Sequence, residues 1–134
     1  MIEDDPGHAL LIKKNLHRNG VKNRLVHLDN GQDALDYFAS YPVSEQTASP
    51  VLVWLDLHLP QVHGFDVLHY LKTNDNTKHI PVIVSTSSNN PQEIERCYAL
   101  GCDMCLVKPV DQSRFNDALR HLGIVLHMPW NKGE

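Results

Sequence analysis

The sequence lacks a run of basic residues, a long apolar stretch and an even number of cysteines, and each absence excludes a class of protein. With no Lys/Arg cluster and a formal net charge of −4, it carries no electrostatic footprint for a nucleic-acid backbone. Its apolar runs are far shorter than the roughly 20 residues that cross a membrane. No charged segment followed by an apolar one opens the chain. We therefore expect a cytoplasmic protein that binds neither nucleic acid nor membrane.

Cysteine and histidine do not form a recognisable metal motif. The three cysteines do not suit a disulfide framework, because their number is odd. Cys97, Cys102 and Cys105 have the spacing of some iron–sulfur proteins, but a cluster needs a fourth thiolate and the sequence has no fourth cysteine. The nine histidines are scattered, without an HExxH motif or a Cys-x2-Cys pair. We interpret the cysteines as ordinary buried thiols.

The sequence does contain an alternation of short apolar runs and helical segments. Its 134 residues, 42% of them hydrophobic, fit one packed domain of about 100–200 residues. Continuous apolar runs at 51–55, 82–84 and 104–107 are typical of strands buried on both faces of a parallel sheet, and 24–28 suits a strand nearer the edge. A strand should also precede Glu3, where only Met1 and Ile2 stand, so we expect N-terminal residues to be missing from the sequence.

Helix signals lie between the apolar runs. Each segment carries apolar residues on one face, and most begin at a capping residue. The predicted starts are Asp5-Pro6, Asn30-Gly31, Gly64, Asn90-Pro91 and Asp111. Repeated strand–helix units of this length require right-handed crossovers, so the pattern predicts an α/β protein with a doubly wound parallel sheet.

Polar residues stand at the carboxyl ends of the predicted strands, where ligands bind in open parallel sheets. Glu3 and Asp4 follow the first run, Asp56 the third, Thr86 the fourth and Lys108 the fifth. Neighbouring carboxylates repel one another and so imply a divalent cation, and oxygen ligands of this kind suit magnesium. A carboxylate beside a metal and an ammonium group is arranged to attack phosphorus, with a hydroxyl to hydrogen-bond a phosphoryl oxygen. Taken singly, each residue also fits a helix cap, a turn or a solvated surface.

Taken together, these residues resemble the CheY-like receiver domains of response regulators over nearly the whole chain. The motifs that carry the resemblance are IEDDP at 2–6, WLDLHLP at 54–60, PVIVST at 81–86 and VKP at 107–109. The resemblance implies a flavodoxin-like fold in which five parallel strands, in the order 2-1-3-4-5, have helices on both faces.

The resemblance also implies a role for each polar residue. The family's acidic metal-binding pair falls on Glu3 and Asp4, its phosphoacceptor on Asp56, its switch hydroxyl on Thr86 and its lysine on Lys108. The family coordinates Mg²⁺ through a backbone carbonyl as well, which here belongs to His58, and its Lys–Pro peptide is cis. The implied function is a two-component response regulator that accepts a phosphoryl group from a sensor kinase's phosphohistidine. Such a domain signals, with self-phosphorylation and autodephosphorylation as its only chemical activities.

The sequence departs from the family at several positions. Glu3 replaces the commoner aspartate, and His63 replaces an aspartate before Gly64. Cys105 stands where the family places the tyrosine or phenylalanine whose rotation reports phosphorylation, and a cysteine is too small for that movement. His58 and Ser88 stand two residues after Asp56 and Thr86, where the family tunes the rate of autodephosphorylation. We hypothesise that His58 positions or excludes the attacking water; a rim histidine without a kinetic role fits equally well.

A narrower resemblance is to single-domain receivers that serve phytochromes and related sensor kinases. It rests on the long loop before the third strand, on 87–89 and on a tryptophan-containing tail. We expect a receiver domain at 1–126, a tail at 127–134 and no output domain. The implied partners are a sensor histidine kinase such as a phytochrome, a histidine phosphotransfer protein, and a second copy docked through the fourth helix, fifth strand and fifth helix.

Two rival interpretations remain. A phosphohydrolase of the haloacid dehalogenase type also uses a strand-end aspartate with magnesium, but it needs a second aspartate where this chain has His58, and a cap domain for which there is no room. A receiver-like interaction module that has lost phosphorylation fits Cys105, but it does not explain the intact set of Asp4, Asp56, Thr86 and Lys108.

Overall fold

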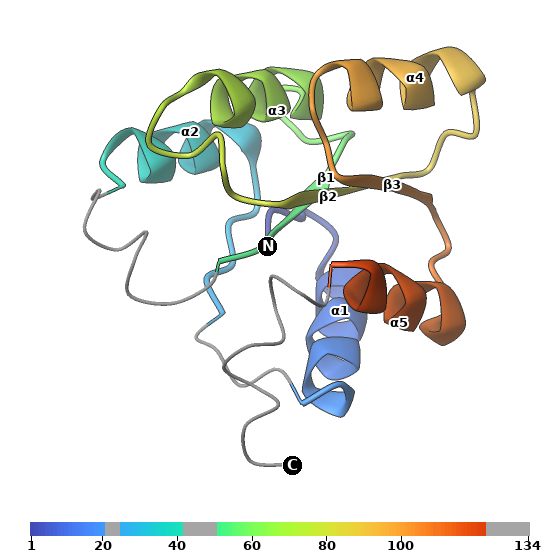
Figure 1. Ribbon diagram of the computed structural model, residues 1–134. Helices are drawn as coiled ribbons and strands as arrows, with labels where there is room; N and C mark the ends of the chain where they lie inside the picture. The colour runs from blue at the N-terminus through green and yellow to red at the C-terminus, as the bar shows by residue number, and fades with distance from the viewer. Residues whose placement is uncertain (21–24, 42–50, 123–134) are drawn as a thin grey trace.

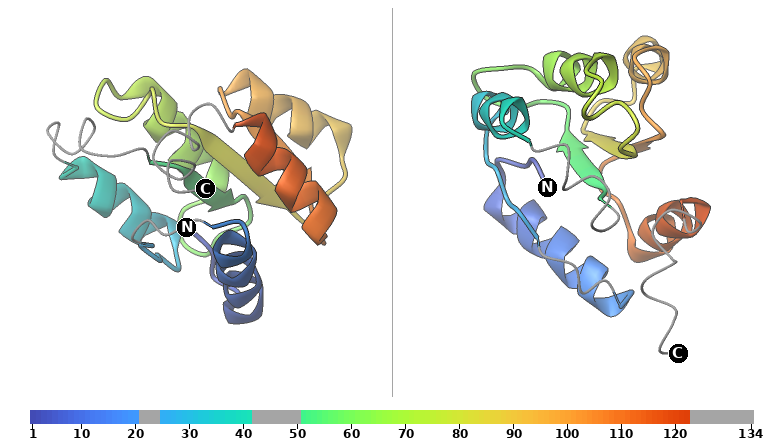
Figure 2. Two further views of the ribbon diagram at one scale, coloured as in Figure 1. Left: turned by 60° about the horizontal axis from the view of Figure 1, so that its bottom comes forward. Right: turned by 60° about the vertical axis from the view of Figure 1, so that its left-hand side comes forward.

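The computed structural model describes residues 1–20, 25–41 and 51–122 and has a three-layer α/β architecture (Figure 1). The helices α1 and α5 cover one face of a parallel sheet, and α2, α3 and α4 cover the other (Figures 1 and 2). The helices span Pro6–Arg18 (α1), Gly31–Ala39 (α2), Gly64–Thr73 (α3), Pro91–Ala99 (α4) and Gln112–His121 (α5). The strands span Val53–Asp56 (β1), Val82–Thr86 (β2) and Met104–Val107 (β3).

The sheet of the described residues has the order β1-β2-β3, with all pairs parallel. Asp56 is paired with Ser85, and Thr86 with Val107, so the carboxyl ends of the three strands lie side by side. Ile2 forms single parallel bridges to Leu28 and Leu55. The predicted strand at 24–28 is therefore reduced, in residues 25–28, to the bridge at Leu28, and the strand expected before Glu3 to the bridge at Ile2. The predicted third strand begins and ends slightly later than expected, at Val53–Asp56.

The helices begin at the capping residues that the sequence predicts. The side chains of Asp5, Asn30, Asn90 and Asp111 each accept hydrogen bonds from backbone N–H groups in the first turn of the helix that follows. These bonds satisfy donors that have no partner inside the helix. At α3 the cap is His63, whose Nδ1 accepts from the Phe65 N–H at 3.1 Å. Local sequence thus fixes where the helices start.

Two apolar cores lie on the two faces of the sheet. Toward α2, α3 and α4, Leu55 and Val84 pack with Val67 and Leu68, and all four side chains are fully buried. Toward α1 and α5, strand residues from the opposite face of the sheet pack with helix residues. The strand residues are Trp54, Ile83 and Leu106, and the helix residues are Ile12, Phe115 and Ala118. Trp54 and Phe115 stack with ring centroids 5.0 Å apart. Both strand faces are buried, which explains the continuous apolar runs in the sequence.

A close approach at Gly64 fixes the loop that leads from Asp56 into α3. The Gly64 N–H donates to the Leu57 carbonyl at 2.8 Å, and a Cβ at this position would lie 2.5 Å from the same oxygen. Only glycine fits without displacing the backbone. The loop after β1 is therefore held against the start of α3, directly beside the end of the strand.

Two predicted features fall outside the described residues. These are most of the irregular loop at 40–50 and the tail at 127–134. Within the described part of the chain, no helix is long and apolar enough to span a membrane.

Candidate functional site

The carboxyl ends of the strands bring the predicted site residues to one edge of the sheet. Asp56 is the last residue of β1, Thr86 is the last residue of β2, and Lys108 directly follows β3. Glu3 and Asp4 reach the same edge because Ile2 bridges to Leu55 of β1. The structure therefore assembles groups that lie far apart in the sequence.

One ammonium group faces two buried carboxylates at this edge. Lys108 Nζ lies 3.3 Å from Asp56 Oδ2 and 3.4 Å from Glu3 Oε1. The Glu3 side chain is fully buried and that of Asp56 is 4% exposed, while that of Lys108 is 21% exposed. Buried charges need such a partner, because the interior solvates them poorly. The peptide between Lys108 and Pro109 is cis, as the sequence predicts.

The two carboxyl groups have opposite pKa shifts. Burial raises the pKa of Asp56 to about 7, assisted by the hydrogen bond and the charge of Glu3, and Lys108 and the His58 N–H only partly offset this. Burial also disfavours the ionised form of Glu3. Its hydrogen bonds with His8, Asp56 and the Asp5 N–H, and the charge of Lys108, nevertheless lower its pKa to about 2. Below neutral pH, the metal-free pair therefore holds one proton, mainly on Asp56.

His8 is a site residue that the sequence analysis missed. Its Nδ1 makes a short hydrogen bond to Glu3 Oε1, while the Asp5 N–H donates to Glu3 Oε2 at 3.2 Å. On the other side, His27 Nε2 donates to the Glu3 carbonyl at 2.8 Å. The contacts from His8 and Asp5 hold the Glu3 carboxylate, and the contact from His27 holds the Glu3 backbone. Among nine histidines, nothing in the sequence marks His8 as the partner of Glu3.

The acidic side chains are placed to share a cation. Each of Glu3, Asp4 and Asp56 offers a carboxylate oxygen, and these oxygens all lie within 4.8 Å of one another. Glu3 and Asp56 are buried and Asp4 is exposed, so the group opens to solvent on one side. Oxygen ligands in a partly open site suit Mg²⁺, which retains several waters. The cysteines make no comparable group: the described residues with clustered metal-ligand atoms are these three acids.

Thr86 and His58 complete the polar edge. Thr86 is fully buried, and its hydroxyl accepts a hydrogen bond from the Ser88 N–H at 3.1 Å. The Lys108 N–H donates to the Thr86 carbonyl at 2.7 Å, which fixes the two strand ends together. The His58 N–H donates to Asp56 Oδ1 at 3.2 Å, so the loop after β1 contacts the aspartate directly.

The two histidines beside the site contact other side chains of the rim. His58 Nε2 lies 3.3 Å from Glu93 Oε1, and the His58 and His63 rings meet edge to face at 5.4 Å. His63 stacks on Phe65 with centroids 4.9 Å apart. Burial and the neighbouring His58 lower the pKa of His63, although Asp66 and Glu93 oppose the shift. At position 63, where the resemblance implies an aspartate, this chain has a histidine whose ring caps α3.

The cysteines lie between α4 and β3. Cys97 and Cys102 are buried, and Cys105 is partly exposed in β3. Cys102 belongs to the connection between these two elements. The interpretation as buried thiols is confirmed for Cys97 and Cys102, whereas Cys105 is only partly buried. A hydrogen bond between the thiols raises the pKa of Cys97, with burial adding to the effect, and lowers that of Cys105.

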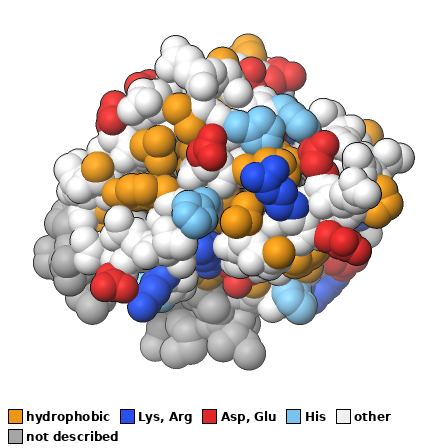
Figure 3. Space-filling model, turned by 90° about the horizontal axis from the view of Figure 1, so that it is seen from above, with side chains coloured by type: hydrophobic (Ala, Val, Ile, Leu, Met, Phe, Trp, Pro, Cys, Tyr) orange, Lys and Arg blue, Asp and Glu red, His pale blue; other side chains and the backbone are white. Residues whose placement is uncertain are grey.

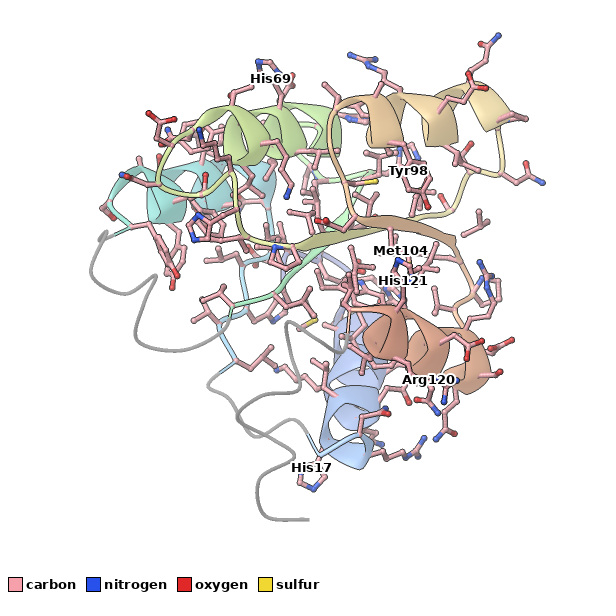
Figure 4. All side chains as sticks on the ribbon, viewed as in Figure 1. His17, His69, Tyr98, Met104, Arg120 and His121 are labelled. Carbon is pink, nitrogen blue, oxygen red and sulfur yellow. The ribbon has the colours of Figure 1, made fainter. Side chains whose placement is uncertain are left out.

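An aromatic side chain reaches position 105 from α4. Tyr98 Oη accepts a hydrogen bond from the Cys105 N–H at 3.0 Å, and Tyr98 lies between the helix and the strand (Figure 4). Position 105 thus has no aromatic ring of its own, but the ring of Tyr98 from α4 lies beside it.

The chain belongs to the response regulator receiver domain family, whose model matches residues 1–120. Receiver domains act in two-component signalling, where an aspartate is phosphorylated and histidine kinases or phosphotransfer proteins are the partners. The family binds Mg²⁺ or Mn²⁺ at an acidic pocket, and the fold is the CheY-like arrangement of a parallel sheet with helices on both faces.

Relatives and solved structures agree with this assignment. The probable methanogenesis regulatory protein FilR2 of Methanothrix harundinacea is 32% identical over 134 residues, which cover 98% of this chain and 84% of the relative. A receiver domain from Rhodospirillum rubrum is 41% identical with a TM-score of 0.75, covering 92% and 89%. The Mn²⁺-bound response regulator Rcp1 is 27% identical with a TM-score of 0.76, covering 95% and 92%, and Rcp1 is a protein of Synechocystis. The structural neighbours also include phytochrome and bacteriophytochrome response regulators.

Proposed function

We propose that this chain is a response regulator in which Asp56 accepts the phosphoryl group. The observation that carries the proposal is the single ammonium of Lys108, which faces the carboxylates of Asp56 and Glu3 at 3.3 and 3.4 Å. It lies where charge develops as an aspartate oxygen approaches a phosphoryl group. Preorganised cations of this kind stabilise phosphoryl transfer.

In the transfer step, an Asp56 oxygen forms a bond to phosphorus as the phosphorus–nitrogen bond of the donor phosphohistidine breaks. The donor imidazole leaves, and Asp56 becomes an acyl phosphate. Lys108 offsets charge on the phosphoryl oxygens. The Thr86 hydroxyl accepts from the Ser88 N–H, so its own O–H is left to donate to one of these oxygens. Attack of water on the same phosphorus breaks its bond to the Asp56 oxygen and releases inorganic phosphate. This returns the carboxylate, so the modification is reversible. Small phosphodonors are expected to serve the first step slowly.

The acidic residues fit a divalent cation. Glu3, Asp4 and Asp56 supply carboxylate oxygens within 4.8 Å of one another, and the His58 carbonyl is the further ligand that the family resemblance implies. Mg²⁺ would neutralise charge on the carboxylates and on the incoming phosphoryl group. His8 and the Asp5 N–H hold the Glu3 carboxylate, so its oxygens are oriented by the protein before a cation binds.

Several finer assignments belong to the same proposal. The bridges from Ile2 to Leu28 and Leu55 favour the five-strand order 2-1-3-4-5. We assign residues 1–126 to the receiver domain and 127–134 to a tail. The resemblance to phytochrome response regulators favours a sensor histidine kinase, such as a phytochrome, as the phosphodonor. A second copy would dock through α4, β3 and α5.

The test is incubation of the full chain with Mg²⁺ and acetyl phosphate or phosphoramidate, followed by intact mass spectrometry. We expect one phosphoryl adduct on the wild type, none on Asp56→Asn, and an unchanged adduct on Asp36→Asn, which alters an exposed acid of α2. Absence of an adduct on the wild type would support the interaction-module alternative. An adduct that persists on Asp56→Asn would overturn the assignment of the acceptor.

A further inference from the structure

The loop that follows Asp56 is connected to α4 through a contact between a histidine and a glutamate side chain. The backbone of His58 donates to Asp56 Oδ1 at 3.2 Å, while its ring Nε2 lies 3.3 Å from Glu93 Oε1 in the first turn of α4. Glu93 Oε1 is itself buried and makes no hydrogen bond to the described residues, so the His58 ring is the group that compensates it. One residue thus contacts the aspartate with its backbone and α4 with its side chain.

A second connection joins the same elements. The Arg96 guanidinium lies over the Phe65 ring at 4.1 Å, Phe65 stacks on His63 at 4.9 Å, and the His63 ring meets the His58 ring. We call the set His58, His63, Phe65, Arg96 and Glu93 the rim clamp; the backbone of α4 joins its two ends, Glu93 and Arg96. The face of the molecule seen from above displays histidine, basic, acidic and apolar side chains side by side (Figure 3).

The spacing within α4 allows both connections at once. Residues three apart lie on one side of a helix, so Glu93 and Arg96 present their side chains to the same neighbours. Glu93 reaches the loop after β1, and Arg96 reaches the start of α3. A displacement of that loop therefore acts on α4 at two points.

We infer that Glu93 is a positioning residue for the phosphoacceptor loop, and that the rim clamp links the state of Asp56 to α4. The inference rests on the proposed function, because it concerns the response to phosphorylation. At position 105 this chain has a cysteine, which cannot report phosphorylation by a ring movement. The rim clamp bypasses that position, since it runs from His58 directly to Glu93 and Arg96.

The expected effects are modest because the clamp is partly exposed. The His58 and Glu93 side chains are 40% and 27% exposed, and an ion pair at such exposure changes an equilibrium by up to about fivefold. Removal of Glu93 should therefore change the phosphoryl half-life about two- to fivefold rather than abolish the modification. If Glu93 positions the loop through His58, each single substitution changes the half-life only in part, and the two effects do not add in the double variant.

The experiment compares His58→Ala, Glu93→Ala and the double variant by their dephosphorylation rates in Mg²⁺. Glu95→Ala is the matched control, because Glu95 is an exposed acid of the same helix. We expect the double variant to resemble either single variant, and Glu93→Gln, which keeps an acceptor oxygen, to retain more of the wild-type rate than Glu93→Ala. Effects of the two single variants that multiply in the double variant would overturn the inference.

A measurement on the unphosphorylated chain separates the two possible failures. We expect Glu93→Ala to shift the amide NMR signal of His58, and beryllofluoride with Mg²⁺ to perturb the α4 amides less in this variant than in the wild type or in Glu95→Ala. If the wild type takes no phosphoryl group, the proposed function is wrong and the inference is overturned with it. If it is phosphorylated but Glu93→Ala behaves as Glu95→Ala does, only the inference is overturned.

Discussion

The acidic pocket at the strand ends and the face between α4 and β3 differ in how their polar groups are held. In the pocket, the side chains of Glu3 and Asp56 are buried and share one cation, Lys108. At the α4–β3 face, Tyr98 is 48% exposed and its hydroxyl meets a backbone amide of a partly exposed strand residue. The first region is a compensated set of buried charges, and the second is a set of weak surface contacts.

This difference predicts that substitutions in the pocket and substitutions at the α4–β3 face have separate effects. Buried charges tolerate little change, because removing one partner leaves another without solvation. Contacts between exposed groups contribute little to the free energy of unfolding, so replacing one of their residues costs little. Lys108 and Asp56 accordingly stand where the resemblance places the family's lysine and acceptor. At the α4–β3 face, Cys105 stands where the resemblance places an aromatic residue, and Tyr98 lies beside it. The following predictions test the contrast, from the largest expected effect to the smallest.

Loss of the cation should have the largest effect. Lys108→Met leaves Glu3 and Asp56 facing each other without a counter-ion, and we expect phosphorylation by a small phosphodonor to slow by about 100- to 1,000-fold. The rate is measured from the mass adduct over time. Lys78→Met, which removes an exposed partner of Asp75, should leave the rate unchanged. Equal rates for the two variants would contradict the role of Lys108.

Rigidity of the loop beside the pocket is tested at Gly64. A Cβ here would lie 2.5 Å from the Leu57 carbonyl, so Gly64→Ala should lower the free energy of unfolding by about 1–3 kcal/mol. Gly7→Ala is the control, because a Cβ in that helical position would meet only Asp5 Oδ1 at 3.3 Å. Urea denaturation should show no comparable loss for Gly7→Ala. A stable Gly64→Ala variant would show that the loop yields.

The proton held by the pocket should make Mg²⁺ binding depend on pH. The pKa of Asp56 is raised to about 7 in the metal-free protein, whereas Mg²⁺ binds the ionised carboxylate. Affinity should therefore fall by up to about tenfold per pH unit below pH 7 and level off above it, when measured by calorimetry. In Asp56→Asn the dependence should disappear. A dependence that persists there would point to a neighbouring histidine instead.

The α4–β3 face should give the smallest effect. Tyr98→Phe removes the acceptor of the Cys105 N–H, and we expect the free energy of unfolding to fall by about 0.5–1.5 kcal/mol. The rate of phosphorylation should not change, because the hydroxyl lies outside the pocket. Tyr70→Phe is the control for loss of a tyrosine hydroxyl. A slower phosphorylation in Tyr98→Phe would show that the two regions are not separate.

The sequence predicted the pocket better than its surroundings. Asp56, Thr86 and Lys108 were predictable because each ends or follows a buried apolar run, and the ends of parallel strands meet at one edge. His8 and Glu93 were not, because neither follows a strand and each belongs to a common residue type. That His8 pairs with Glu3, and Glu93 with His58, is decided only by the three-dimensional packing of α1 and α4 against the strand ends.

The sequence alone determined the alternation of strands and helices, the helix starts at Asp5, Asn30, Asn90 and Asp111, and the chemistry available at the strand ends. These features depend on local periodicity and on side-chain type, which the chain carries everywhere along its length. Only the tertiary structure decided that one ammonium faces two carboxylates, and that the loop after Asp56 is joined to α4. Those contacts depend on distances between elements, and the packing of the two cores against the sheet sets those distances.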